Sequence, residues 1–280
     1  MKDKIGFIQG RLSPIVNGMI QAFPWDNWQQ EFFDAHSLDF KLMEWTLDQN
    51  KLYKNPLMLP EGQKAIKSLS QKFSLTIPSL TGDCFMQAPF WKASKILRFE
   101  LLNDFRNITQ ASKEIGISII VIPLVDNGKL ENKEQEDILI NSLMDYSEFL
   151  KKLNIRIAFE SDYGPHELAT FIERFGDETF GINYDIGNSA ALGYDPKEEF
   201  DSYCEYILNV HIKDRKLHGT TVPLGAGSAN FLEVFRCLSK MKYDGNYILQ
   251  TARSDTSDHH SPLVSYREIA LEWLLMKNYY

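Results

Sequence analysis

Four side chains that can bind a divalent metal ion end four consecutive apolar stretches of the sequence. They are Glu160 in IRIAFE, Asp185 in FGINYD, His211 in ILNVHI and Gln250 in YILQ, and they lie 25, 26 and 39 residues apart. One such residue alone is as often a helix cap or an ion-pair partner, but four in succession are hard to obtain by chance. Two carboxylates, an imidazole and an amide oxygen suit one Mn²⁺, Zn²⁺ or Co²⁺ ion, with Mg²⁺ as the harder alternative.

These stretches belong to a series of eight short apolar and β-branched runs, each followed by a longer segment with the period of a helix. We predict strands at Ile5–Gln9, Phe40–Trp45, Leu75–Leu80, Ile117–Leu124, Ile155–Glu160, Phe180–Ile186, Ile207–Ile212 and Tyr247–Thr251. Runs such as SIIVIPL are apolar throughout, which is typical of parallel strands that are covered by helices. The spacing matches the roughly 30 residues per unit of a (β/α)8 barrel.

The predicted fold is therefore one (β/α)8 TIM barrel domain that spans residues 1–280. Alternation over the whole length leaves no room for a second domain. A doubly wound open sheet is the structural alternative, but eight units without a glycine-rich phosphate loop favour the closed barrel. The C-terminal ends of barrel strands form the active face, so the four metal ligands would meet there.

Helix signals fill the segments between the strands. Asp195-Pro196 and Ser261-Pro262 each place a proline directly after a capping residue, where the first helical residue is expected. Apolar residues from 139 to 153 step by three and four and form one stripe. The run DHH at 258–260 resembles a metal motif in isolation, but its place before a helix favours a solvated loop.

Composition and charge narrow the class of protein. The chain has 280 residues, 44% hydrophobic and 24% charged, with a net charge of −8, which disfavours nucleic acid as a partner. Its three cysteines (Cys84, Cys204 and Cys237) are isolated and form no CxxC pair, so we predict reduced thiols and a cytoplasmic location. No apolar run approaches the ~18 residues of a membrane span, and the amino terminus has no signal-peptide pattern. A homo-oligomer is left open.

Several runs of the sequence, in order along nearly the whole chain, carry a resemblance to a known family: IGFIQGRLSP, FKLMEWT, IAFES, NYDIGN, NVHIKDR, TTVPLGAGSANF and YILQTAR. They resemble the sugar-phosphate isomerase/epimerase family of the xylose-isomerase-like TIM barrel superfamily. The resemblance implies metal ligands at Glu160, Asp185, His211 and Gln250, where the fourth is usually a glutamate. In ketose epimerases of this superfamily the first and fourth glutamates also act as the acid/base pair.

Two departures from the family pattern bear on the reaction. Gln250 can bind a metal through its amide oxygen but cannot exchange a proton. The run LGAGSANF also lacks the acidic residue that related chains often have after its first glycine. Both departures argue against a standard two-base 3-epimerase.

The expected chemistry is proton transfer next to the carbonyl of a sugar or sugar phosphate, through an enediolate. A divalent ion would stabilise that charge, and Glu160 is the best-placed base. With one base, removal and return of the proton on the same face would give aldose–ketose isomerisation. Epimerisation would need a second acid, for which Lys213, Glu44 and a bound water are the candidates.

Basic and polar residues after the strands are candidates for substrate binding. Lys213 and Arg215 follow His211, while Arg11 and Arg253 follow the first and last predicted strands. They could hold a phosphate or carboxylate, or they could form salt bridges with neighbours such as Glu44. Asn188 lies three residues after Asp185, where family members place a polar group on the substrate or on metal-bound water; its structural alternative is a helix cap.

Three other functions remain open. A lyase of the same barrel type, such as a dehydratase of a cyclic polyol or keto acid, would expel a β-hydroxyl and need an extra acid that the sequence does not identify. A non-catalytic sugar-binding relative would keep the barrel, with Gln250 marking lost catalysis. A phosphodiesterase acting on damaged DNA is disfavoured by the net charge and by the lack of additional His and Glu ligands.

Overall fold

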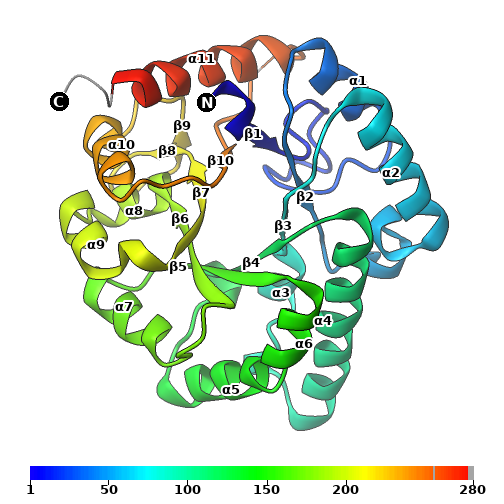
Figure 1. Cartoon of the computed structure of the whole chain (residues 1–280), viewed down its shortest axis with the longest axis vertical. Coiled ribbons are helices and arrows are strands. Elements are labelled where there is room, and N and C mark those ends of the chain that lie inside the picture. The colour runs from blue at the N-terminus through cyan, green and yellow to red at the C-terminus, as the bar shows by residue number, and fades with distance from the viewer. Residues whose placement is uncertain (255, 277–280) are drawn as a thin grey trace.

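Eight parallel strands close into a barrel in the order β1-β10-β7-β6-β5-β4-β3-β2 in the computed structural model, which describes residues 1–254 and 256–276. Figure 1 shows the helices as a ring around these strands. The barrel strands are β1 Ile5–Ile8, β2 Met43–Thr46, β3 Ser79–Thr81, β4 Ile119–Leu124, β5 Arg156–Ser161, β6 Phe180–Asp185, β7 Ile207–Ile212 and β10 Tyr247–Leu249. All eight overlap the predicted strands, and the predicted (β/α)8 barrel is confirmed.

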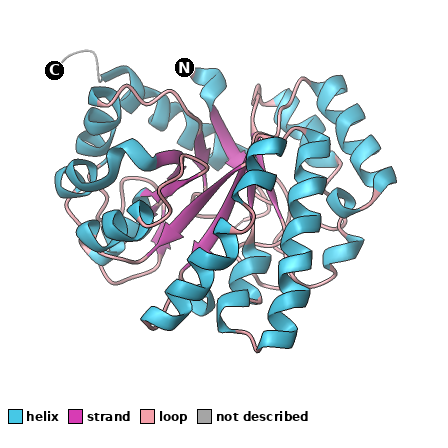
Figure 2. Cartoon of the chain, turned by 60° about the horizontal axis from the view of Figure 1, so that its bottom comes forward, coloured by secondary structure: helices cyan, strands magenta, loops and turns pink. Residues whose placement is uncertain are grey.

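The helices lie outside the barrel and cover its outer surface (Figure 2). The helices between successive strands are α1 Gln30–Ser37, α2 Pro60–Phe73, α3 Asp83–Gln87, α4 Lys95–Ile115, α5 Lys133–Met144, α6 Ser147–Leu153, α7 Pro165–Glu173, α8 Ile186–Leu192, α9 Pro196–Tyr203 and α10 Phe231–Lys240, and α11 His260–Met276 follows the last strand. Within the described residues, no helix is both long and apolar enough to cross a membrane.

The helix signals are confirmed in part. Asp195 caps α9 as predicted, because its side chain accepts hydrogen bonds from two backbone N–H groups of the first turn. The predicted cap at Ser261 is wrong: α11 begins at His260, and Asp258 accepts from the N–H groups of His260 and Ser261. The apolar stripe from 139 to 153 is divided between α5 and α6.

A buried carboxyl group fixes the loop that follows β1. Glu31 of α1 is fully buried and accepts hydrogen bonds from the backbone N–H groups of Gly10, at 3.0 and 3.1 Å, and of Leu12, at 3.1 Å. Burial raises the pKa of Glu31 to about 7, against these hydrogen bonds, which act to lower it. The loop between the two bonded positions carries Arg11, so Glu31 sets the course of the chain at this strand end.

This raised pKa predicts a pH-dependent stability. The folded chain favours the neutral acid, so the contribution of Glu31 is fully present below its ordinary pKa of 4.5 and is lost as the pH rises through about 7. We expect Glu31→Gln to flatten the fall in the free energy of unfolding between these pH values, measured by urea titration. The exposed Glu61→Gln is the control. Parallel curves for wild type and Glu31→Gln would contradict the prediction.

Candidate metal centre

Three of the four predicted ligands meet at the C-terminal ends of neighbouring strands. Glu160 is the penultimate residue of β5, Asp185 ends β6 and His211 is the penultimate residue of β7. One ligand atom from each lies within 4.8 Å of the others. Asp185 and His211 are also paired in the register of β6 and β7. All three side chains are buried. The spacing of one ligand per strand therefore brings them to one point, as the barrel geometry requires.

Glu44 binds the imidazole of His211 on the side away from Glu160 and Asp185. Nε2 of His211 lies 2.8 Å from Oε1 of Glu44, and both side chains are fully buried. This leaves Nδ1 facing the other carboxylates, 3.4 Å from Oε2 of Glu160. Burial alone would lower the pKa of His211, but Glu44 and Glu160 together raise it to about 10. A metal-binding histidine commonly donates its second N–H to a carboxylate in this way.

Glu44 is itself saturated with hydrogen-bond donors. Besides His211, it accepts from the hydroxyl of Ser79 at 2.6 Å, from the hydroxyl of Thr81 and from Nδ2 of Asn209 at 3.0 Å. Burial opposes its charge, but His211 and these hydrogen bonds lower its pKa. Glu44 thus lies inside the barrel, below the strand ends, rather than at the open face.

Glu160 is fixed by two amide groups. Oε2 accepts from Nδ2 of Asn183 at 2.9 Å, and Oε1 accepts from Nδ2 of Asn188 at 2.6 Å. Nη1 of Arg215 in turn donates to Oδ1 of Asn188 at 2.9 Å, which sets the amide so that its NH₂ group faces Glu160. Although burial opposes the charge, His211 and the neighbouring cation lower the pKa of Glu160, so it is held as a carboxylate.

Asp185 has one oxygen committed to the fold and one that faces the site. Oδ1 accepts from the backbone N–H of Asn188 at 2.8 Å and caps α8. Oδ2 is buried and receives no well-directed hydrogen bond from the residues described, although Nζ of Lys213 lies 2.7 Å away. Burial raises the pKa of Asp185, and Lys213 opposes that rise.

Lys213 joins the fourth predicted ligand to the cluster. Its Nζ donates to Oε1 of Gln250 at 2.8 Å while it pairs with Asp185. A positive charge is thus already accommodated between these two oxygens. The residues fit a divalent ion: Oδ2 of Asp185 lacks a directed donor, Nδ1 of His211 faces the carboxylates, and the donor set of two carboxylates, an imidazole and an amide is one that such ions accept.

The predicted anion-binding residues do not gather at one point. Arg11 is buried, and it donates to the carbonyl groups of Thr251 and Ile20 and to the side chain of Gln21. Burial and the nearby Arg253 lower its pKa to about 9. Arg253 is half-buried and donates to the carbonyl group of Ser13, and its Nε is buried without a partner among the described residues. Arg215 is occupied by Asn188 and by the carbonyl group of Gly219.

A family model described as xylose isomerase-like TIM barrel matches residues 32–275. The chain belongs to this family. The predicted resemblance is thereby confirmed.

Three known proteins are similar to this chain in sequence or in structure. L-ribulose-5-phosphate 3-epimerase UlaE of Escherichia coli O1:K1 / APEC is 23% identical over 250 residues, which are 86% of this chain and 88% of that protein. A solved structure of an L-ribulose 3-epimerase superposes with a TM-score of 0.75 at 12% identity, covering 98% of this chain and 95% of the other. The IOLI protein with a bound zinc atom gives a TM-score of 0.74 at 13% identity, covering 97% and 98%. At these identities the structural likeness shows the fold.

In this xylose isomerase-like barrel, the VPLGAGSANF run forms a loop around Asp214. The Asp214 carboxylate accepts hydrogen bonds from the backbone N–H groups of Gly225 and Gly227, both at 2.9 Å, and of Ala229 at 3.2 Å. A Cβ at Gly227 would lie 2.1 Å from Oδ1 of Asp214, so only glycine fits. The loop follows the short ribbon of β8 Asp214–Arg215 and β9 Thr221–Val222. Asp214 therefore shapes this loop.

Two buried amide side chains of the site, which the sequence analysis did not name, each lie two residues before a predicted ligand. Asn183 precedes Asp185 by two residues, and Asn209 precedes His211 by two. Residues two apart on a strand share a face, so both side chains point into the barrel below the ligands. Asn209 donates to Oδ1 of Asn183 at 2.9 Å, and Asn183 donates to Glu160.

Asp83, at the end of β3, is the other residue missed. It is 7% exposed. Burial, together with the carboxylates of Asp48, Glu160 and Glu44, raises its pKa well above the ordinary value. Because it directly follows β3, Asp83 lies at the same end of the barrel as the metal residues. The predicted strand ended at Leu80, an apolar residue, and so gave no polar candidate there.

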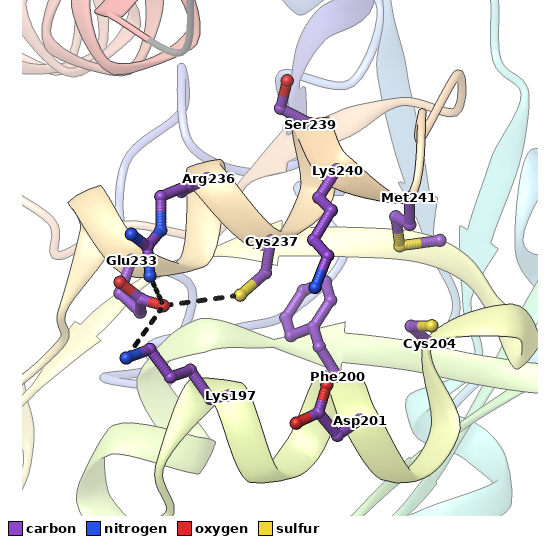
Figure 3. A pocket seen from close by; sticks show the side chains of 10 residues that line it. All are labelled: Lys197, Phe200, Asp201, Cys204, Glu233, Arg236, Cys237, Ser239, Lys240 and Met241. Atoms are coloured by element: carbon purple, nitrogen blue, oxygen red, sulfur yellow. Dashed lines mark hydrogen bonds and ion pairs between the residues drawn. The ribbon is translucent and has the colours of Figure 1, made fainter. Parts of the chain in front are cut away.

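A pocket of about 730 Å³ lies elsewhere, on the outer side of the barrel between α9 and α10 (Figure 3). Three of its charged groups lie together: Oε1 of Glu233 lies 2.6 Å from Arg236 and 4.0 Å from Lys197, and Cys237 lies 3.8 Å from the same oxygen. None of the candidate metal residues lines it. The chemistry suggested by the sequence belongs to the strand ends, not to this pocket.

Proposed function

We propose that this chain is a divalent-metal-dependent isomerase or epimerase that acts on a ketose or ketose phosphate. The observation that carries the proposal is the convergence of Glu160, Asp185 and His211, with Gln250 joined to them through Lys213. The curated relative is an L-ribulose-5-phosphate 3-epimerase, one structural neighbour is an L-ribulose 3-epimerase and another holds zinc. These names support the same class of substrate and the need for a metal.

The proposed mechanism assigns a different task to each buried group. A divalent ion held by Glu160, Asp185, His211 and Gln250 would supply Lewis-acid polarisation of the substrate carbonyl. Glu160 takes the proton from the carbon next to that carbonyl, and the amides of Asn183 and Asn188 keep both of its oxygens in place. The two amides also disfavour other rotamers of Glu160, because each of its carboxylate oxygens already accepts a hydrogen bond.

Glu44 and Lys213 take supporting roles in this proposal. Glu44 orients His211 from inside the barrel, where its four donors leave it no free lone pair aimed at the open face. Lys213 has a side chain only 12% exposed, beside Asp185, from where its ammonium group can donate to a substrate oxygen as negative charge develops. Gln250 contributes its amide oxygen and no proton.

A phosphate on the substrate would most readily meet Arg253. Its buried Nε has no partner among the residues described, whereas Arg11 and Arg215 direct their donors at backbone carbonyls and at Asn188. Arg215 acts on the site indirectly in this proposal, by setting the amide that holds Glu160. Arg11 shapes the neighbouring strand ends, since it bonds to Thr251 and to the loop at Ile20.

Proton NMR in D₂O tests the proposed function. Metal-loaded protein is incubated with ketoses, free and phosphorylated, and the loss of each carbon-bound proton is followed. Exchange at C1 with an aldose product indicates an isomerase, and exchange at C3 with inversion indicates an epimerase. Loss of a hydroxyl with formation of a double bond would assign the chain to the lyases. No exchange on a broad panel, with the metal shown to be bound, would overturn the proposal in favour of a binding protein.

A further inference from the structure

Asp83 begins α3, directly after β3. Ser79 and Thr81 both donate to Glu44 inside the barrel, so the side chains at 79 and 81 point inward. Asp83 follows Thr81 by two residues and is the first residue of α3, so it lies just beyond the C-terminal end of β3, at the open end of the barrel. The charges that act on it are those of Asp48, Glu160, Glu44 and His211.

The backbone on both sides of Asp83 is held in the sheet. The N–H of Gly82 donates to the carbonyl group of Val121 on β4, and the N–H of Cys84 donates to that of Leu47 beyond β2, both at 2.9 Å. A Cβ at Gly82 would lie 2.9 Å from the carbonyl oxygen of Val121 and 2.5 Å from the ring of Phe85. These contacts and hydrogen bonds fix the backbone on either side of Asp83.

The carboxyl group of Asp83 differs from that of its neighbour Asp48 in its hydrogen bonding. Within residues 1–254 and 256–276, the carboxyl group of Asp83 makes no hydrogen bond to protein and no salt bridge, although the residue is only 7% exposed. Its neighbour Asp48 differs: its two oxygens accept from the N–H of Phe23 at 2.8 Å and from Nε2 of Gln87 at 2.9 Å. A largely buried carboxyl group that no protein donor holds is typical of a group kept for a ligand or for proton transfer.

The barrel order sets Asp83 across from the metal residues. Four strand-to-strand steps separate β3 from β7 in either direction around the barrel, so Asp83 and His211 lie on opposite walls. Glu160, on β5, is two steps from β3. A sugar bound over the barrel axis would therefore meet Glu160 and Asp83 from two different sides.

Resting on the proposed function, we propose that Asp83 is the second proton-transfer residue of the site and takes the place of the carboxyl group that Gln250 cannot supply. Glu160 removes the proton from the carbon next to the carbonyl and becomes a carboxylic acid. The enediolate takes its new proton from the carboxyl group of Asp83 on the other side of that carbon, and Asp83 becomes a carboxylate. Exchange of one proton with solvent at each residue restores the starting state, and the net reaction is epimerisation.

The test separates proton removal from proton return. Wild type and Asp83→Asn, both metal-loaded, are incubated in D₂O with the ketose that wild type converts. We expect Asp83→Asn to form the epimer at least about 100-fold more slowly, while Glu160 still exchanges the proton of the unconverted substrate. Asp48→Asn makes the same chemical change in the neighbouring carboxyl group and should keep the wild-type ratio of epimer to exchange. Divalent-ion affinity, by calorimetry, should be unchanged in Asp83→Asn.

The outcomes distinguish this inference from the function on which it rests. Wild-type protein without any exchange overturns the proposed function itself. Wild-type exchange together with a normal rate of epimer formation in Asp83→Asn overturns only the role of Asp83. If Asp83→Asn does not fold, by circular dichroism, Asp83→Glu replaces it: a proton donor is retained, so epimer formation should persist at a reduced rate. Complete loss of both epimer formation and exchange in a folded Asp83→Glu would contradict the proposal.

Discussion

Glu160→Gln is expected to slow proton exchange from the substrate about 10²- to 10⁴-fold. Glutamine keeps the length of the side chain and one oxygen for the metal, but it cannot accept the proton. Asn183 and Asn188 donate to the two oxygens of Glu160, so one of these donors would face the new NH₂ group and that contact would be lost. We therefore expect a moderately weaker metal affinity beside the large loss of rate. Single-turnover exchange in D₂O measures the rate.

The matched control is Glu178→Gln, which makes the same change at an exposed position before β6 and should leave the rate unchanged. Near-native exchange in metal-loaded Glu160→Gln would show that another group removes the proton. A loss of metal in proportion to the loss of rate would instead reduce Glu160 to a ligand without a role as base.

Glu44→Gln is expected to weaken divalent-ion binding about 10- to 100-fold, as changes behind a metal-binding histidine commonly do. The carboxylate holds Nε2 of His211 at 2.8 Å and is fully buried. Glutamine could keep a hydrogen bond but would remove the negative charge that fixes the ring and makes Nδ1 a better donor to a cation. Calorimetric titration of the chelator-treated protein with Mn²⁺ gives the affinity.

The sequence also suggested Glu44 as a substrate contact or a second acid, and the same variant tests that hypothesis. A substrate contact would change KM and leave the metal affinity at its wild-type value. Ser79→Ala removes one of the hydroxyl groups bonded to Glu44 and should show a smaller loss of metal affinity. Unchanged Mn²⁺ affinity in Glu44→Gln would contradict the orienting role.

The barrel could be predicted from the sequence because each buried strand leaves an apolar, β-branched run at regular spacing. The predicted strand ends were less accurate where the apolar pattern of the sequence and the hydrogen-bonded pairing of the strands disagree. The run predicted as Leu75–Leu80 is a strand only at Ser79–Thr81; before it, Thr76 makes just an isolated bridge to Leu42. Pro78 has no N–H to donate to a ladder, which shortens the strand at its beginning.

The same short strand explains what the sequence missed in the site. Polar residues at predicted strand ends identified Glu160, Asp185 and His211, which the structure brings together. Asp83 was missed because the predicted strand stopped at Leu80, whereas β3 continues to Thr81 and Asp83 begins α3 two residues later. The sequence also named Glu44, but its depth in the barrel depends on partners from two other strands, β3 and β7, and no local pattern contains such tertiary contacts.

The most direct test of the account is a crystal structure of the protein soaked with Mn²⁺, with anomalous diffraction to locate the ion. We expect one strong peak bounded by Glu160, Asp185, Nδ1 of His211 and Oε1 of Gln250, at ligand distances of roughly 2.0–2.3 Å. The ammonium group of Lys213 should have moved away from Oδ2 of Asp185 to make room. A peak held by other residues, or no peak while Lys213 still bridges Asp185 and Gln250, would contradict the metal centre.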